Sequence, residues 1–125
     1  MRILTAILIS TAMIAPSLAQ PRRLPNNDKI RQVFAGNTIS GREGGKAYVE
    51  FFHPNGRISG EASDGKYSGN WQVSRGRVCL SYEKGNGGRT AWDCSNISVN
   101  GSRIVWIAEG KKFFSALARG NPRGL

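Results

Sequence analysis

The chain has 125 residues, of which 39% are hydrophobic, and 18 Lys and Arg against 8 Asp and Glu give it a net charge of +10. This length predicts one small domain. With one histidine, His53, and two cysteines, the composition excludes a structural zinc site and a CxxC-type redox site.

The N-terminus has the pattern of a secretory signal peptide. Arg2 supplies a positive charge, residues 3–15 form an apolar run, and Pro16 precedes the small residues Ser17 and Ala19. The run is too short for a typical membrane span, although an uncleaved anchor is the alternative. We therefore predict a signal peptide over residues 1–19, cleavage after Ala19, and a periplasmic or secreted protein. No later apolar run is long enough to span a bilayer.

The mature chain stays strongly basic. Removing residues 1–19 takes away Arg2, which leaves 106 residues with 17 Lys and Arg against 8 Asp and Glu, a net charge of +9. In an exported protein this charge favours anionic lipid, lipopolysaccharide or acidic glycan as partners, rather than nucleic acid. The basic residues are spread along the chain, so general solvation is an equally good interpretation.

Residues 20–28 are polar, contain two prolines and predict a linker. Asn27 or Asp28 can cap a short helix over residues 29–35, which Gly36 would end. Ile30, Val33 and Phe34 give this helix one apolar face that could dock on a sheet.

Short alternating runs separated by turn residues follow Asn37, at the spacing of an antiparallel meander. Asn100-Gly101 is a strong hairpin signal. The predicted strands cover residues 37–41, 46–53, 57–62, 66–73, 77–83, 90–99, 102–107 and 112–117. These indicate an all-β domain over residues 29–118, a barrel or a sandwich of seven or eight strands, and a flexible tail at 119–125. A closed barrel is favoured because it hides its edges.

The two cysteines, Cys79 and Cys94, predict one disulfide in an exported chain. Both fall on the polar side of their strands, so we expect a cross-strand disulfide on the outer face, with Trp92 beside it. The same register pairs Ser81 with Trp92 and Glu83 with Thr90. The loop closed is about 15 residues, for which the chain-entropy model predicts roughly 3 kcal/mol of stabilisation.

Alternation also predicts the core and a filled interior. In one strand Tyr67, Gly69, Trp71 and Val73 share a face, and in the next Val78, Leu80 and Tyr82 do. The expected structural core is Tyr48, Phe51, Trp71, Leu80 and Tyr82. The core is the favoured place for any one aromatic residue, but a surplus on the outer face, such as Trp92 or Phe52 near Arg and Lys, could bind a sugar or lipid.

The disulfide register places Asp93 on the inner face, opposite Leu80. A buried carboxylate there would need an arginine or a tyrosine hydroxyl as partner, and the alternative is a bulge that turns it outward. Trp92, Asp93 and Arg77 are the candidate ligand-binding residues.

No arrangement typical of catalysis is present. His53 lies in a turn without a recognisable nucleophile, and the acids, Glu50, Glu61 and Glu83 among them, fall at outward or turn-adjacent positions. No phosphate loop, dinucleotide motif or metal-ligand spacing occurs. We therefore expect no enzyme activity, no catalytic residue, no cofactor and no metal.

Four segments carry a resemblance: GNTISG from Gly36, YVEFFHPNG from Tyr48, GNWQVSRGRVCLSY from Gly69, and Trp92-x-Cys94. Together they resemble small exported alphaproteobacterial proteins of domain-of-unknown-function families, over about residues 33–99. The resemblance implies a periplasmic β-barrel-like domain and no established activity. Gly69-x-Trp71 also resembles the calycin fingerprint, which lies near the start of calycin chains but in the middle of this one.

These features favour a non-enzymatic exported β-barrel protein that binds an anionic envelope component. One alternative is an inhibitor of a host or rival enzyme, as small disulfide-bonded barrels inhibit lysozyme, although lysozyme is basic like this chain. The other is a carrier of a small apolar ligand. A carrier needs a hollow interior, whereas the many aromatic residues predict a filled one.

Overall fold

The computed structural model describes residues 22–23 and 26–125. The predicted signal peptide, residues 1–19, lies outside the described residues, and so do residues 20, 21, 24 and 25 of the predicted linker.

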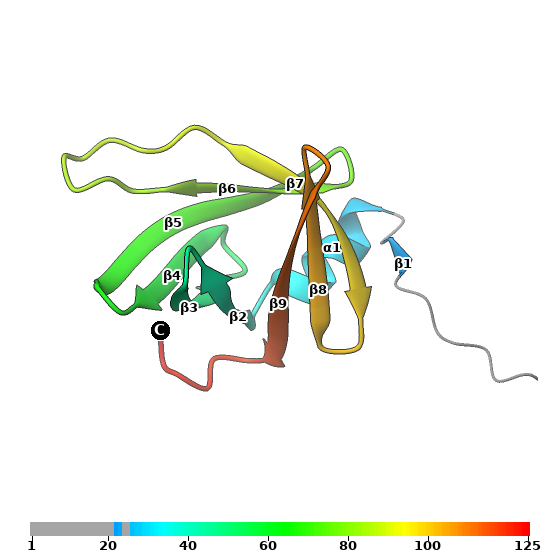
Figure 1. The fold of residues 1–125 in the computed structure, drawn as a ribbon, viewed down its shortest axis with the longest axis horizontal. Helices are drawn as coiled ribbons and strands as arrows, with labels where there is room; N and C mark the ends of the chain where they lie inside the picture. Colours follow the sequence, from blue (N-terminus) through cyan, green and yellow to red (C-terminus); the bar gives the residue numbers. More distant parts are fainter. Residues whose placement is uncertain (1–21, 24–25) are drawn as a thin grey trace, which may run out of the picture.

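Eight antiparallel strands form a closed barrel (Figure 1). Each strand pairs with the next along the chain, and the last pairs with the first, so the meander closes on itself. The barrel strands are β2 (Asn37–Glu43), β3 (Lys46–Phe52), β4 (Arg57–Ala62), β5 (Gly65–Ser74), β6 (Arg77–Tyr82), β7 (Asp93–Asn100), β8 (Arg103–Ala108) and β9 (Lys111–Arg119). The all-β barrel prediction is confirmed.

The pairing of β6 with β7 is the shortest seam of the barrel. Only Val78, Cys79 and Leu80 of β6 pair with β7 in the named strands. Farther along β7, a two-residue strand, β1 (Arg22–Arg23), pairs with Val99 and Ser98. The seam is therefore completed by a segment from the start of the described chain and by the disulfide.

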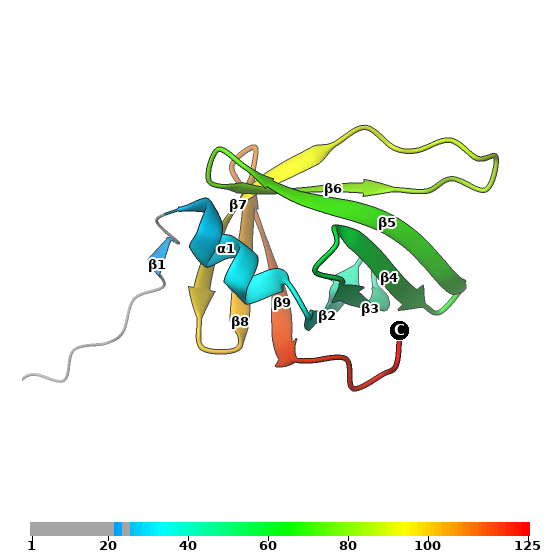
Figure 2. The same cartoon turned by 180° about the vertical axis from the view of Figure 1, so that it is seen from behind.

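The one helix of the described residues, α1 (Asn27–Phe34), lies across one end of the barrel (Figure 2). Its cap is Asn26, whose side chain accepts the Lys29 amide, rather than the predicted Asn27 or Asp28. Gly36 follows with φ +76°, a conformation that glycine adopts without strain. Ile30 and Phe34 are fully buried, so the apolar face closes the barrel end instead of lying on an outer sheet surface.

The core surrounds Phe34. Its ring contacts three others, with centroid distances of 5.1 Å to Phe52, 5.3 Å to Trp106 and 6.3 Å to Trp71. The Trp71 indole N–H donates to the His53 carbonyl at 2.9 Å, which satisfies its only polar atom. The helix end of the barrel is therefore filled, as predicted, by aromatic and branched aliphatic side chains.

The core prediction needs one correction in β3. Phe52 is fully buried among the core residues, whereas Phe51 is half-buried and packs on His53 with ring centroids 4.6 Å apart. Successive strand residues face opposite sides, so Phe52 shares the inner face with Tyr48 and Phe51 cannot. Predicting both Tyr48 and Phe51 in the core violated this alternation.

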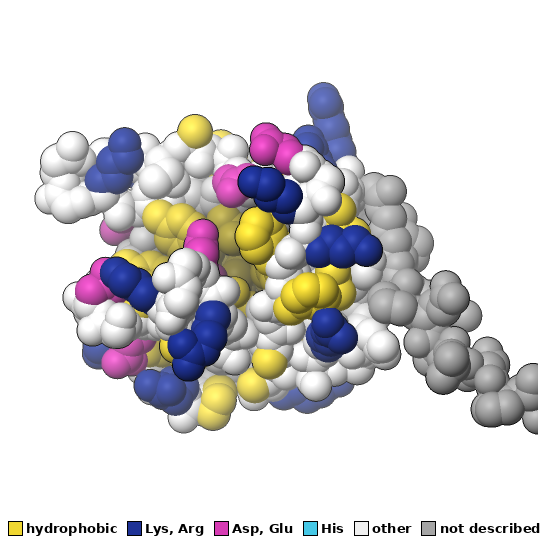
Figure 3. Space-filling view, in the orientation of Figure 1, with side chains coloured by type: hydrophobic (Ala, Val, Ile, Leu, Met, Phe, Trp, Pro, Cys, Tyr) yellow, Lys and Arg dark blue, Asp and Glu magenta, His cyan; other side chains and the backbone are white. Residues whose placement is uncertain are grey.

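On the face drawn in Figure 3, basic side chains are spread over several elements, with hydrophobic side chains between them. Among the described residues, the exposed large hydrophobics are Trp92, Phe113 and Phe114. Trp92 was expected outside. The Arg89 guanidinium lies 5.8 Å from its ring centroid, and that of Arg103 lies 4.3 Å from Phe114. No helix in residues 22–23 and 26–125 has the length and hydropathy to cross a bilayer.

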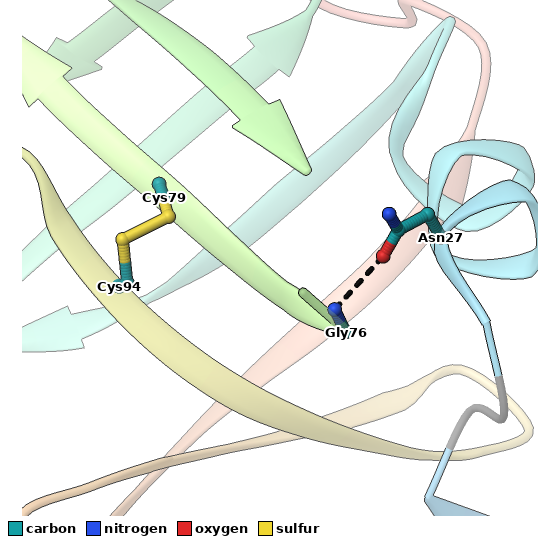
Figure 4. Close-up of a disulfide and its surroundings, with 4 residues drawn as sticks. All are labelled: Asn27, Gly76, Cys79 and Cys94. Atoms are coloured by element: carbon teal, nitrogen blue, oxygen red, sulfur yellow. Dashed lines mark hydrogen bonds between the residues drawn. A yellow bond between two sulfur atoms is a disulfide. The ribbon is translucent and has the colours of Figure 1, made fainter. Parts of the chain in front are cut away.

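The predicted disulfide joins Cys79 of β6 to Cys94 of β7, which are directly paired (Figure 4). Cys79 lies opposite in parity to the core residue Val78, yet it is only 1% exposed. The turn that precedes β6 is also tied to α1, because the Asn27 side-chain oxygen accepts the Gly76 amide at 2.8 Å. Strand β6 is thus fixed at both its helix end and its middle.

The predicted register fails beyond the disulfide. Glu83 bridges to Arg89 rather than to Thr90. The cause is Thr90, whose hydroxyl accepts the Tyr82 amide while its own amide donates to the Tyr82 carbonyl. Its carbonyl also accepts the Ser81 hydroxyl at 2.7 Å, in place of the predicted pairing of Ser81 with Trp92. The Thr90 hydroxyl thus takes the place of a backbone carbonyl as acceptor for the Tyr82 amide, and the strand pairing beyond Tyr82 is shifted by one residue.

Candidate ligand-binding cavity

The barrel is hollow at the end away from α1. In a meander, alternate hairpins lie at the same end, so the β2–β3, β4–β5 and β8–β9 turns share one end and α1 packs near the β5–β6 turn at the other. A cavity of about 650 Å³ opens between those three turns and the β6–β7 hairpin. Figure 3 shows hydrophobic side chains deep in this recess. The interior is thus filled at one end only, which corrects the prediction of a filled barrel.

A glutamate forms the polar centre of this cavity. Glu50 of β3 is only 6% exposed and lines the cavity wall. The hydroxyls of Tyr82 and Tyr67 both donate to its Oε1 atom, at 2.7 and 3.0 Å. Because the two tyrosines come from β6 and β5, the cluster joins three strands, β3, β5 and β6, around one carboxyl oxygen.

The second carboxyl oxygen of Glu50 is left for the cavity. Both tyrosine hydroxyls donate to Oε1. Among the described residues, every side-chain oxygen that is fully shielded from solvent has a hydrogen-bond partner. We infer that Oε2 keeps access to the cavity space. A ligand could therefore reach Oε2 without displacing either tyrosine.

Burial sets the protonation behaviour of the cluster. Desolvation raises the pKa of Glu50 above its ordinary value of 4.5, and the hydrogen bonds from Tyr82 and Tyr67 oppose this rise. Desolvation, followed by the nearby Glu50 charge, raises the pKa of Tyr48 to about 12. The same causes raise the pKa values of Tyr67 and Tyr82, so these hydroxyls remain neutral donors at any physiological pH.

Three glycines hold the three tyrosines against the wall. Each tyrosine pairs across the sheet with a glycine, and the pairs are Gly41 with Tyr48, Gly60 with Tyr67, and Gly69 with Tyr82. A Cβ atom on Gly41 would lie 2.7 Å from the Tyr48 hydroxyl oxygen, one on Gly69 would lie 2.9 Å from the Tyr82 ring, and one on Gly60 would overlap the Tyr67 ring. None of these three glycines has a positive φ, so they are needed for space rather than for backbone conformation. The rings lie over the glycines and leave the centre of the barrel open.

The rest of the lining is apolar below and charged at the mouth. Trp106 donates its indole N–H to the Ser115 hydroxyl at 2.7 Å, which fixes one wall. The charged side chains that line the mouth are three basic and three acidic, namely Arg42, Lys46, Lys66, Glu43, Asp64 and Asp93. Lys46 and Asp64 form an ion pair at 3.5 Å. The basic excess of the chain is therefore absent from the mouth of the cavity.

The three predicted ligand-binding residues do not come together. Asp93 pairs with Leu80 and lines the cavity as the register predicts, but its side chain is exposed at the mouth and has no arginine or tyrosine partner among the described residues. Arg77 begins β6 at the end where α1 packs, and Trp92 is exposed outside the cavity. Only Asp93 of the three lines the cavity.

Three of the residues predicted to fill the core line the cavity. Tyr48, Tyr82 and Leu80 face inward as predicted, yet they line the cavity instead of filling it. Trp71 is a core residue, as predicted.

The sequence interpretation missed Glu50 and Tyr67. Glu50 was expected at an outward or turn-adjacent position, but it shares the parity of Tyr48 and Phe52, which face in. The available signal was the spacing of glycine and tyrosine on strands joined by a hairpin, such as Gly60 and Tyr67 around the turn at residues 63–64. An inward glycine opposite an aromatic residue indicates a ring lying flat on the wall.

The cavity has the volume of a small molecule and a carboxyl in its wall, but it has few groups for other chemistry. Among the described residues, no group of three or more His, Cys, Asp or Glu side chains could hold a metal ion. His53 bonds to Ser59 at 2.8 Å and does not line the cavity. The deep polar groups are thus a carboxyl and neutral hydroxyls.

Comparison with known proteins adds no relative: no protein-family model, curated protein or solved structure matches this chain.

Proposed function

We propose that the protein is an exported, non-enzymatic β-barrel that binds a small, largely apolar molecule in the cavity at its open end. The observation that carries this proposal is the cavity of about 650 Å³ with Glu50 buried in its wall. Such a volume is typical of small-molecule sites, which are mostly apolar with a few placed polar groups. The N-terminal sequence and the disulfide support export.

The tyrosines favour binding over catalysis. A catalytic acid or base must have a pKa near the working pH. Burial and the Glu50 charge move the pKa values of Tyr67 and Tyr82 away from that range, and both hydroxyls already donate to Glu50. A pre-positioned, neutral donor pair around one carboxyl is suited to fix the orientation of a ligand.

A fluorescent apolar probe tests this proposal. N-phenyl-1-naphthylamine is uncharged and should brighten on entering the cavity, with saturable binding to one site. Ala62 lies on the inner face opposite Tyr48 and lines the cavity, so Ala62→Trp should weaken probe binding by about tenfold or more through lost space. Ala116 is exposed on β9, and Ala116→Trp is the matched control that should bind like wild type. Failure of the wild type to bind, or equal loss in both variants, would contradict the proposal.

A second candidate function rests on the β8–β9 hairpin. Phe113 and Phe114 are 53% and 50% exposed, and Lys111 and Lys112 precede them. Arg103 covers the Phe114 ring. Exposed aromatic rings beside basic side chains are suited to the surface of an anionic membrane. This supports the anionic envelope component that the net charge indicates.

Vesicle sedimentation tests this second candidate. Binding should be seen with vesicles containing anionic lipid and should fall as salt is raised, because exposed charges are screened. The double change Lys111→Gln and Lys112→Gln should weaken binding severalfold. The control variant, Lys29→Gln with Arg77→Gln, removes the same charge at the α1 end of the barrel. Salt-independent binding, or equal weakening by both pairs, would count against the hairpin.

A further inference from the structure

We propose that the ligand is an organic cation, an amine or ammonium group on an aromatic or aliphatic body, and that its charged group binds Glu50 Oε2. This inference rests on the cavity being a ligand site, as proposed above. It goes further by stating which chemical class the cavity selects.

Glu50 is a buried carboxyl without a cationic partner. The ion pairs among the described residues join Arg31 to Asp28, Lys46 to Asp64, Arg57 to Glu83 and Arg123 to Glu61, and none includes Glu50. A carboxylate buried without a counter-ion is costly, and the cost falls when a cation is supplied. A ligand amine would supply that charge at the one oxygen, Oε2, that remains open to the cavity.

The tyrosine donors favour the ionised carboxyl as the ligand-binding form. Both hydroxyls donate to Oε1, which stabilises negative charge on the carboxylate. An anionic ligand would meet the same charge at Oε2 and be repelled. A neutral alcohol could donate one hydrogen bond there but would leave the charge uncompensated.

The walls around Glu50 are suited to a cation in a second way. Aromatic rings from Tyr48, Tyr67, Tyr82, Trp106 and Phe113 line the cavity. The faces of such rings attract ammonium groups, and aromatic cages with a carboxylate are a recurrent solution for amine recognition. The opposing glycines fix three of these rings against the wall, so no large rearrangement is needed on binding.

The mouth of the cavity does not oppose a cation. Its three basic and three acidic side chains balance, and Lys46 is already paired with Asp64. The mouth therefore presents no net barrier to a monocation, while Glu50 provides the only charge buried deep in the wall among the described residues. Charge selection is thus expected at depth rather than at the surface.

Displacement of N-phenyl-1-naphthylamine by three matched compounds tests the inference. 4-Phenylbutylamine, 4-phenylbutan-1-ol and 4-phenylbutanoate share one body and differ in the terminal group. At pH 7.5 the amine should displace the probe with a Kd at least about tenfold below that of the alcohol, since charge-assisted contacts are the stronger ones. The carboxylate should bind weakest. Equal displacement by all three, or tighter binding of the carboxylate, would overturn the inference while leaving the cavity proposal intact.

Variants assign the selectivity to Glu50. Glu50→Gln should lose most of the amine preference, measured as the ratio of amine to alcohol affinity within that variant. Glu61→Gln is the matched control, because Glu61 lies on β4 and does not line the cavity, and it should keep the preference to within about twofold. Should Glu50→Gln fold poorly, the double change Tyr67→Phe and Tyr82→Phe provides the second test. That variant keeps the rings but removes both donors, and it should reduce the amine preference severalfold. An undiminished amine preference in either Glu50→Gln or the phenylalanine variant, or its loss in Glu61→Gln, would refute the assignment.

Discussion

The two ends of this barrel are built from the same strands but have opposite interiors. At the α1 end, Phe34 fills the space between Phe52, Trp71 and Trp106. At the other end no helix of the described residues enters, the tyrosines lie flat over glycines, and a cavity of about 650 Å³ remains. The difference teaches that a barrel of this size can have a filled core at one end and keep an open cavity at the other.

Single strands show this change along their length. On the inner face of β3, Phe52 lies in the core, Glu50 in the cavity wall and Tyr48 nearer the mouth. On β5 the order from the mouth is Tyr67, Gly69, Trp71 and Val73. The core and the cavity lining therefore use different residues of one strand, and mutations can change one without the other.

The largest expected effect is at the closed end. Phe34→Ala should lower the free energy of unfolding by about 3–5 kcal/mol, because a fully buried ring leaves a cavity that the helix cannot refill. Phe113→Ala, at the exposed mouth, should cost less than about 1 kcal/mol. Urea unfolding followed by tryptophan fluorescence measures both. Similar losses at the two positions would remove the contrast between the ends.

Loss of the disulfide should come next. The bridge closes a 15-residue separation at the seam where β6 and β7 share few pairs. Cys79→Ala with Cys94→Ala should lower the free energy of unfolding by about 3 kcal/mol, mainly through a less restricted unfolded chain. Thermal melts of the variant and of the reduced wild type check this. An unchanged melting temperature would contradict a structural role for the bridge.

The glycine positions allow a smaller and more local test. Gly60→Ala forces a Cβ atom into the Tyr67 ring and should cost about 1–3 kcal/mol, with weaker probe binding as the ring moves into the cavity. Gly85→Ala is the control, since Gly85 has no positive φ and no atom within 4 Å of the new Cβ. Unfolding curves and probe titrations report the two effects separately. If Gly60→Ala behaved like Gly85→Ala, the tyrosine ring would not be held as described.

The smallest effect concerns pH. Because burial raises the folded-state pKa of Glu50 above 4.5, its contribution to stability is complete at pH values below the unfolded pKa and is lost as pH rises through the folded pKa. Wild type should therefore lose stability relative to Glu50→Gln as pH increases from about 4 to 8. Unfolding free energies of the two proteins across this range measure the difference. A constant difference, or a wild type that loses stability relative to Glu50→Gln as pH falls, would contradict the raised pKa.

The fold was predictable from sequence because turn residues and alternation recur along the whole chain. The eight strands, the disulfide pair and the inward face of β5 follow from local patterns that the structure confirms. The cavity was not predictable in this way. Whether inward tyrosines fill a barrel depends on what lies opposite each ring, and the glycines opposite Tyr48, Tyr67 and Tyr82 become visible as partners only once the register is known.

Glu50 shows why a functional residue can be missed. The sequence interpretation placed Glu50 among the acids at outward or turn-adjacent positions, although its parity with Phe52 puts it on the inner face. Its burial is compatible with folding because two tyrosine hydroxyls on other strands satisfy it. Such long-range partners are absent from any local pattern, so the rule that charges face solvent fails at this position.

The three tryptophans make one measurement a direct test of the account. Trp106 lines the cavity, Trp71 is in the core beside Phe34 and Trp92 is exposed outside. In ¹⁵N-labelled protein titrated with 4-phenylbutylamine, the indole N–H signal of Trp106 should shift saturably while those of Trp71 and Trp92 stay in place. A shift at Trp92 alone, or no saturable shift at Trp106, would contradict a binding site at the open end of the barrel.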